Sequence, residues 1–260
     1  AGAPVVEISR IEPITNNVWK GVSSAGVAFE NLAENTSATA KQATLAQPTV
    51  TAHKIAAFVP FSLEIEGDWP NFAGEMSRLI NQAYVDYLAE KTITGTGTIE
   101  MFGIVTALDA NAGSEVTVTS DGLLSPEDAL KLWSNVPERY RRSSNWLSDV
   151  SVESEFRKNG DSQGLYTVSL TSEGIGVING RRYYTTDYMT SFDGTTGAAN
   201  LAVLGDFQNY VIAQRVGMSI EVIPHVFDGD GLPKGQRGYF AWARVGADSV
   251  NDDAFRLLQN

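Results

Sequence analysis

Residues 68–91 read DWPNFAGEMSRLINQAYVDYLAEK, and this stretch has the pattern of one long amphipathic helix. Asp68 can cap free amides at its start, Pro70 is tolerated in a first turn, and Gly95 and Gly97 follow where the helix must stop. Each residue of a helix adds about 1.5 Å, so the pattern predicts a rod of roughly 33 Å. The apolar side chains recur at steps of three and four, which places them on one face; they are Phe72, Met76, Leu79, Ile80, Ala83 and Tyr87.

The residues before this helix predict extended structure that buries little. Residues 1–24 lack periodicity, and Pro4 and Pro13 argue against a helix, so we expect an extended arm there. Residues 26–31 show a short strand signal, 34–49 are small and polar, and 50–65 (VTAHKIAAFVPFSLEI) are typical of a strand, so a long hairpin around a polar tip is predicted. Its few large apolar groups cannot form a core of their own. Two interpretations remain, a mobile loop or an arm that packs against another subunit.

The residues after the helix mix strands with short helices, which favours an α+β fold. The sequence GTGTIEMFGIVTA, residues 95–107, predicts a sharp turn followed by a strand. Residues 125–142 predict a helix capped by Ser125 and ended or kinked by Pro137. A short helix is predicted for 151–161, stopped at Asn159-Gly160. Strands are predicted for 115–119, 145–150, 176–189, 199–204, 210–223 and 239–245, and residues 253–258 close the chain.

The composition suits a folded protein that binds neither nucleic acid broadly nor a membrane. The 260 residues carry a formal net charge of −12, and 43% of them are hydrophobic, which is enough for a core. Affinity for DNA phosphates and for anionic lipids comes from Lys and Arg, so the negative charge argues against both partners. No apolar run approaches the roughly 18 residues of a membrane-spanning helix. The absence of cysteine fits a reducing compartment or a secreted protein without disulfides.

Side chains that could bind a metal or catalyse a reaction are sparse. His53 and His225 are the only histidines, and without cysteine a zinc site would need mostly carboxylates. Residues 228–231, Asp-Gly-Asp-Gly, resemble the opening of a calcium loop, but Leu232 and Pro233 break the pattern and favour a simple turn. We therefore expect no catalytic centre, no metal and no cofactor.

One pair of carboxylates leaves an alternative open. Glu64 and Glu66 would lie on the same face of a strand, roughly 7 Å apart. Paired carboxylates can serve a carbohydrate-active enzyme. They can equally be solvated, or paired with basic residues at an interface, and we favour this second interpretation.

Basic residues gather in two short clusters. Arg139, Arg141 and Arg142 form one cluster, and Arg181 and Arg182 form the other. Either cluster can face water or pair with acids on a neighbouring copy. We favour pairing, because the guanidinium fork suits carboxylates at interfaces.

Taken in order, these parts resemble the major capsid protein of tailed bacteriophages, which has the Hong Kong 97-type fold. Residues 50–72, VTAHKIAAFVPFSLEIEGDWPNF, match the family's strand and the acid before its long helix. Residues 83–104, AYVDYLAEKTITGTGTIEMFGI, match its acidic helix end and Gly-x-Gly turn. Residues 204–224, LGDFQNYVIAQRVGMSIEVIP, and 238–258, GYFAWARVGADSVNDDAFRLL, resemble its later passages. Each motif is loose, and their order and spacing carry the resemblance.

The resemblance implies a division of the chain and an assembly. The implied parts are an N-terminal arm (1–24), an extended hairpin loop (25–66), a peripheral domain with the spine helix (67–115), an axial domain (116–222), peripheral-domain return strands (223–246) and a tail returning to the axial domain (247–260). The family assembles as pentamers and hexamers into an icosahedral shell around double-stranded DNA. The chain begins at Ala1, and either a trimmed chain or the removal of a leading segment, which many members shed, fits that start.

The implied partners are other copies of the chain, a portal protein, and decoration or scaffolding proteins. The shell encloses DNA without binding it specifically, contacts no membrane, belongs to the virion and is assembled in the host bacterial cytoplasm. A related alternative is an encapsulin-like protein nanocompartment, and a remote one is the carbohydrate-active enzyme.

Several residues are candidates for contacts between subunits. Asn35 and Lys41 lie near the predicted hairpin tip, and Glu64, Glu66 and the five arginines join them. Some family members crosslink a hairpin Lys to an Asn of a neighbour, but residues 228–238 contain no Asn, so we expect no crosslink. We expect residues 1–66 to be completed only by sister copies. If the opening residues were folded back into the chain's own hydrophobic interior, the container interpretation would have to be abandoned.

Overall fold

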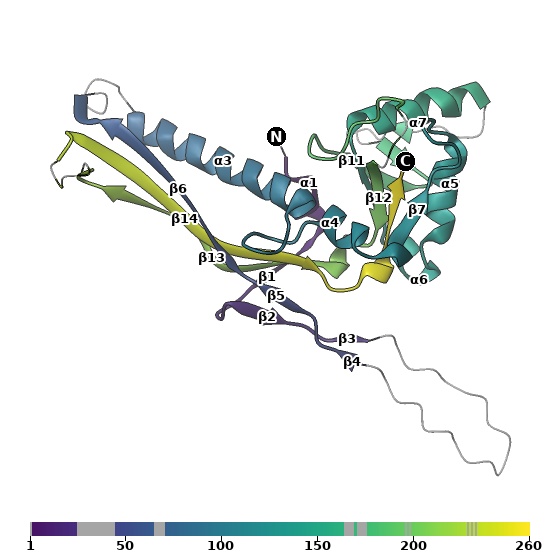
Figure 1. Cartoon of the computed structure of the whole chain (residues 1–260), viewed down its shortest axis with the longest axis horizontal. Helices are drawn as coiled ribbons and strands as arrows, with labels where there is room; N and C mark the ends of the chain where they lie inside the picture. The colour runs from purple at the N-terminus through teal and green to yellow at the C-terminus, as the bar shows by residue number, and fades with distance from the viewer. Residues whose placement is uncertain are drawn as a thin grey trace, which may run out of the picture.

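The long helix predicted within residues 68–91 is present, and it lies along a four-stranded sheet in the elongated half of the molecule (Figure 1). A rounder lobe built on a seven-stranded sheet forms the other half. The mixture of helices with mainly antiparallel strands confirms the predicted α+β fold. The structure is a computed structural model and describes residues 2–24, 45–64, 71–163, 169–170, 176–195, 197, 199–227, 229, 231 and 233–260.

The four-stranded sheet, called here the long sheet, has the order β1-β13-β14-β6. β14 pairs antiparallel with β13 on one side and with β6 on the other, while β1 pairs parallel with β13. β14 has 14 residues, so it extends well beyond the strand predicted at 239–245. The strands are β1 (Arg10–Pro13), β6 (His53–Ser62), β13 (Tyr210–Ile223) and β14 (Gln236–Ser249).

The helix that covers this sheet is α3 (Phe72–Thr94), and its bounds differ from the prediction at both ends. The expected cap Asp68 and the expected first-turn residue Pro70 lie outside the described residues. The largest buried cluster, called here the main core, includes Val5, Ile93, Ile104, Leu108 and Phe255. At its C-terminal end α3 runs past Lys91, because Ile93 is buried in this core and holds the last turn against it.

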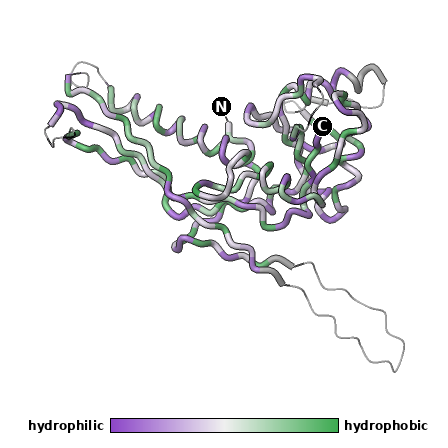
Figure 2. Tube along the Cα trace, in the orientation of Figure 1, coloured by the Kyte–Doolittle hydropathy of each residue, from purple (hydrophilic) through white to green (hydrophobic). Residues whose placement is uncertain are grey.

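One face of α3 packs on the long sheet, as the spacing predicted. The ring of Phe72 lies 5.0 Å from that of Phe61 on β6, which stacks 5.1 Å from Tyr239 on β14. Ile80 joins the same buried cluster. Figure 2 shows hydrophobic and hydrophilic residues alternating along the helix, as expected for an element with one buried side.

The rounder lobe holds strands in the order β7-β15-β12-β8-β11-β10-β9. The neighbouring strands β8 and β12 are buried along most of their length, and the C-terminal strand β15 lies beside β12. The end of the chain therefore completes this sheet. The strands are β7 (Glu115–Thr117), β8 (Asn145–Ser148), β9 (Ser169–Leu170), β10 (Gly176–Ile178), β11 (Arg181–Thr185), β12 (Asn200–Gly205) and β15 (Phe255–Gln259).

The first residues fold onto their own body, which contradicts the expected extended arm. α1 (Pro4–Ile8) is a short helix whose Val5 is 0% exposed in the main core. Pro4 stands in the first helical turn, where its missing amide costs nothing. Since α1 is buried, β1 and β6 belong to the long sheet and Val50 packs against β13, the expectation that residues 1–66 wait for sister copies is wrong for these parts. This burial counts against a container inferred from the opening residues alone.

A helix follows the glycine turn where a strand was predicted. Thr96 and Phe102 pair across the turn, and α4 (Ile104–Asp109) comes next. The β-branched Ile104 favours a strand locally. Tertiary packing overrides this preference, because Ile104 and Leu108 both reach the main core from one face of the helix.

The helix predicted from Ser125 is confirmed together with its cap. Asp128 accepts hydrogen bonds from the backbone and side chain of Ser125, which forms the capping box of α5 (Pro126–Asn135). Pro137 then separates α5 from α6 (Glu138–Arg141).

Two other boundaries in the lobe differ from the prediction. α7 (Val150–Gln163) continues through Asn159 and Gly160, where a stop was expected. The strand predicted at 176–189 is instead the hairpin of β10 and β11, because Asn179 and Gly180 form a turn with φ of 53° and 72°.

Candidate functional site

The described residues form no cluster suited to metal binding. Among them no three His, Cys, Asp or Glu side chains are placed to hold a metal ion, and no helix of that part is long and apolar enough to cross a bilayer. β6 ends at Ser62 and Glu64 lies exposed in a helical turn, so the expected strand face shared with Glu66 is wrong for Glu64. Glu66 itself lies outside the described residues.

A hairpin projects from the long sheet below β1 (Figure 1). Its described strands pair antiparallel, β2 with β5 and β3 with β4. These are not the strands that the sequence predicted. The strand expected at 26–31 lies outside the described residues, β4 falls within the expected polar tip at 34–49, and most of the strand expected at 50–65 is β6 of the long sheet. We call the described strands of this hairpin, within residues 18–24 and 45–51, the hairpin arm. The strands are β2 (Val18–Lys20), β3 (Ser23–Ser24), β4 (Leu45–Ala46) and β5 (Thr49–Thr51).

The base of the hairpin arm is packed against the body. Val50 is 2% exposed and forms a small core with Val211 and Ala213 of β13, beside Trp19. A side chain at Gly246 of β14 would not fit, because a Cβ there would lie 2.0 Å from the carbonyl oxygen of Thr51. The backbone of β5 therefore lies directly on β14.

Two arginines of the long sheet hold the entry to the hairpin arm. Arg215 donates a hydrogen bond to the carbonyl oxygen of Thr15 at 3.1 Å and another to the side-chain oxygen of Asn17. Arg244 donates to the same Asn17 oxygen at 3.0 Å, and the Asn17 carbonyl accepts from the amide of Ala52 at 2.8 Å. The direction in which the arm leaves the body is thus fixed at Asn17. Sequence reasoning missed this contact, because no local motif marks it.

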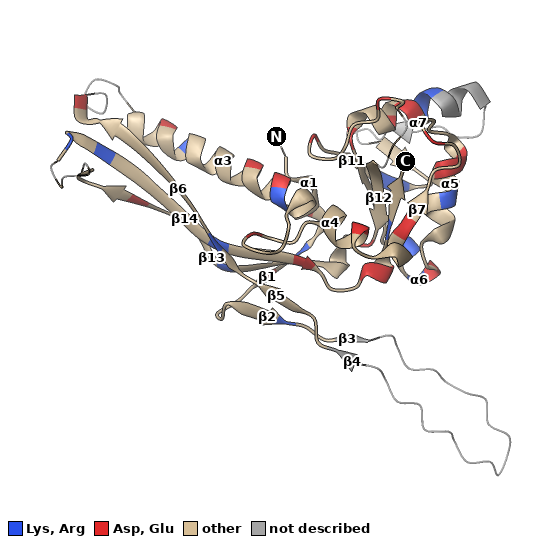
Figure 3. Ribbon diagram, in the orientation of Figure 1, with Lys and Arg blue, Asp and Glu red and all other residues tan. Residues whose placement is uncertain are grey.

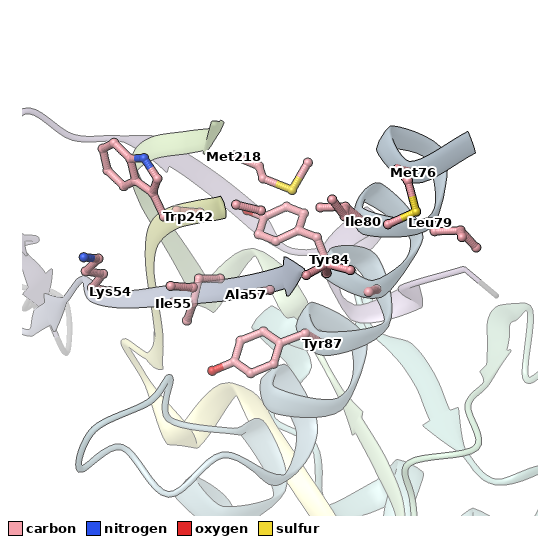
Figure 4. Close-up of a pocket in the computed structure, with 15 residues that line it drawn as sticks. Lys54, Ile55, Ala57, Met76, Leu79, Ile80, Tyr84, Tyr87, Met218 and Trp242 are labelled. Carbon is pink, nitrogen blue, oxygen red and sulfur yellow. The ribbon is translucent and has the colours of Figure 1, made fainter. Parts of the chain in front are cut away.

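An apolar groove of about 610 Å³ lies between α3 and the long sheet. Five of the six residues of the predicted helix face line it, and Leu79 among them remains 48% exposed. In Figure 4 Met76, Ile80, Tyr84 and Tyr87 of α3 lie toward Ala57 and Ile55 of β6 and Met218 of β13. Burial raises the pKa of the Tyr84 phenol. The packing of α3 on the sheet therefore leaves part of this apolar surface exposed to solvent.

The two basic clusters predicted from sequence come together in one pocket of about 550 Å³. We call it the arginine pocket, and it is lined by Trp133, Glu138, Arg139, Arg141, Arg142 and Arg181. Arg182 does not line it, since successive side chains of a strand point to opposite faces. Figure 3 shows how acidic residues are spread over the lobe that carries this pocket.

The end of α3 is tied to the body by polar contacts. Lys91 forms an ion pair with Glu100 at 3.1 Å. The hydroxyl of Tyr210, buried on β13, lies 2.7 Å from the carbonyl oxygen of Phe102 and 3.1 Å from that of Thr92. Burial raises the pKa of Tyr210 well above its ordinary value, so the phenol stays a hydrogen-bond donor. These contacts join the helix, the glycine turn and the long sheet.

Two of the candidate contact residues cannot be placed. Asn35 and Lys41 lie outside the described residues. The arginines are described and four of them meet in one pocket, whereas Arg215, Arg244 and Gly246 were not among the candidates. The importance of Arg215, Arg244 and Gly246 can be recognised only from their contacts in the folded chain.

One family model matches the chain, and several solved structures share its fold. The model of the Phage capsid family matches residues 2–260. The solved capsid of a native GTA particle has a TM-score of 0.81 at 16% sequence identity, with 100% of this chain and 90% of that chain covered. The structure from Microbacterium phage Oxtober96 has a TM-score of 0.71 at 14% identity, with 99% and 91% covered. The holo-SrpI encapsulin complex from Synechococcus elongatus has a TM-score of 0.75 at 13% identity, with 99% and 87% covered. No curated protein sequence matches this chain.

Proposed function

This chain belongs to the phage capsid family and is a major capsid protein of the virion, and we propose that it assembles as pentamers and hexamers into a closed icosahedral shell around double-stranded DNA. The observation that carries the proposal is the hairpin arm, which has a fixed base and projects from the body. An arm of this kind gains its remaining burial from another copy, because apolar area removed from water is stabilising.

The placement of the arm and the groove supports a ring of subunits. The hairpin arm leaves the long sheet below β1, whereas the apolar groove lies under α3. A contact that joins two different patches of the same chain is heterologous, and heterologous contacts close into rings when the rotation permits. Rings of this kind are the pentamers and hexamers that a shell needs.

For the division of the chain we keep the boundaries that the resemblance implies. The lobe with β7 to β12 supports an axial domain over most of 116–222, to which the tail at 247–260 contributes β15, whereas β13 within that range belongs to the long sheet. α3 and β14 support a peripheral domain that includes 67–115 and 223–246, but the long sheet also takes β1, β6 and β13 from ranges that the resemblance assigns to other parts. Asn35, Lys41, Glu64 and Glu66 of the 25–66 loop remain proposed contacts between copies, as do the arginines.

Electron microscopy and light scattering of the purified protein test the proposal. Closed particles of uniform size are expected, and a chain that stays monomeric under all assembly conditions would refute it. Deletion of residues 34–44 should leave a folded subunit, judged by circular dichroism, but impair shell closure. An unchanged particle yield would remove the hairpin arm from the reasoning. Portal, decoration or scaffolding proteins should co-purify with particles made in the host cytoplasm.

A protein nanocompartment is the second candidate, favoured by the likeness to the encapsulin complex. The two candidates differ in their contents. Nuclease-protected DNA inside purified particles supports the virion shell, whereas enclosed protein cargo without DNA supports the nanocompartment. A denaturing gel of the same particles should show single chains, because we expect no covalent crosslink between copies.

A further inference from the structure

The arginine pocket holds more positive charge than its surroundings neutralise, and we propose that it binds carboxylate side chains of a second copy of this chain. The identity of the partner rests on the proposed shell, whereas the pocket itself is a feature of the single chain. Glu138 is the one acid among the residues that line it. Within the described residues no carboxylate lies within 4.0 Å of the guanidinium groups of Arg139, Arg141, Arg142 or Arg181.

The topology of the lobe brings these residues together. β8 and β11 are parallel neighbours in which Trp146 pairs with Tyr183, so both strands begin at the same edge of the sheet. Arg181 is the first residue of β11, and α6 ends shortly before β8 begins. The arginines of α6 therefore stand beside Arg181 although they are far apart in sequence.

The pocket is partly organised before any ligand arrives. Arg141 donates to the carbonyl oxygens of Ser134 at 3.2 Å and Val136 at 2.8 Å, and its guanidinium lies 5.7 Å from the ring centre of Trp133. A side chain held in this way loses little freedom on binding. The Nε atoms of Arg141 and Arg181 are buried without an acceptor among the described residues, and no carboxylate there pairs with either guanidinium, so both side chains keep their full charge for a ligand.

The shape and the charge of the molecule favour a carboxylate over a DNA phosphate. A recess of about 550 Å³ admits side chains, whereas a duplex presents its phosphates along a rod that is too wide to enter. The net charge of −12 repels DNA, and it means that any neighbouring copy of the chain is rich in carboxylates. Four arginines in such an acidic chain are the complement that a neighbouring copy requires.

The first test replaces Arg181 with Lys in the full chain, which keeps the charge and supplies a primary amine. Particles are assembled from an equal mixture of ¹⁵N-labelled and unlabelled chains and treated with a carbodiimide, which couples amines to touching carboxylates. Mass spectrometry should find position 181 joined to an Asp or Glu of a chain with the other label. Lys158 serves as the internal control, because it lies 3.1 Å from Glu155 of its own chain. Coupling at Lys158 with none between chains at position 181 would overturn the proposal.

A second test reverses charge at the two exposed arginines, Arg139→Glu with Arg142→Glu, and uses Lys158→Glu as the matched control. The double variant should lower particle yield about tenfold or more, since like charges facing across an interface repel, while the control stays near wild type. If the double variant assembles normally but loses enclosed DNA, the pocket binds DNA phosphates, and the proposal that it binds carboxylates of a second copy is refuted. If the wild-type chain forms no particles while the Arg181→Lys variant still couples position 181 to another copy, the shell is refuted and the binding of carboxylates by the pocket stands.

Discussion

Replacing Gly246 with Ala tests whether the hairpin arm is held by direct contact of its backbone with β14. The added Cβ would lie 2.0 Å from the carbonyl oxygen of Thr51 and 2.6 Å from its carbonyl carbon. An ordinary contact between carbon and oxygen is about 3.3 Å, so the two backbones must separate by roughly 1.3 Å. Because backbone must move, and because the shift also uncovers Val50, we expect the free energy of unfolding to fall by about 2–3 kcal/mol.

The effect should fall on the hairpin arm more than on the sheet. Limited proteolysis should cut the arm of the Gly246→Ala variant faster than that of wild type, and light scattering should show fewer closed particles. Urea denaturation of dissociated subunits gives the change in stability. Gly217→Ala on neighbouring β13 is the control, because its nearest atom would be the side-chain nitrogen of Gln214 at 3.5 Å. A Gly246→Ala variant that matches this control in stability, proteolysis and assembly would refute the reasoning.

Three further predictions concern the lobe and its junction with the long helix. Asp128→Ala removes the acceptor of four hydrogen bonds and should cost about 3–5 kcal/mol in urea denaturation, whereas the exposed neighbour Glu127→Gln should cost less than about 0.5 kcal/mol. Tyr210→Phe leaves two carbonyls without their buried donor and should cost about 1–2 kcal/mol, with faster amide exchange at the end of α3 as the second readout. Burial, aided by the charge of Asp252, raises the pKa of Asp248 to about 6, so the contribution of Asp248 to stability should fall as pH rises from about 4 to about 6. Asp248→Asn should then be more stable than wild type at pH 7 by about 1 kcal/mol, after discounting for solvent screening, and not at pH 4.

The elements that local pattern predicted are those whose burial is one-sided and regular. The face of α3 follows from the spacing of Met76, Ile80 and their neighbours, because a helix places every third and fourth residue together. The cap of α5 follows from Ser125 and Asp128, which interact within one turn.

The elements that pattern missed are short and are fixed by distant contacts. α1 has too few residues to show a period, and it is helical because Val5 enters the main core. α4 carries β-branched residues that favour a strand, and its burial against the same core decides otherwise. In both cases packing outweighs a weak local preference.

The order and type of the main elements, the family and the two basic clusters could be recognised from the sequence, because these properties depend on residues near one another in the chain. The tertiary structure alone decided that the clusters form one pocket, that Arg215 and Arg244 meet at Asn17, and that Gly246 supports the hairpin arm. These contacts depend on which strands pair and in what register. A single chain carries no local signal for register, since it is set by how distant segments fill a shared core.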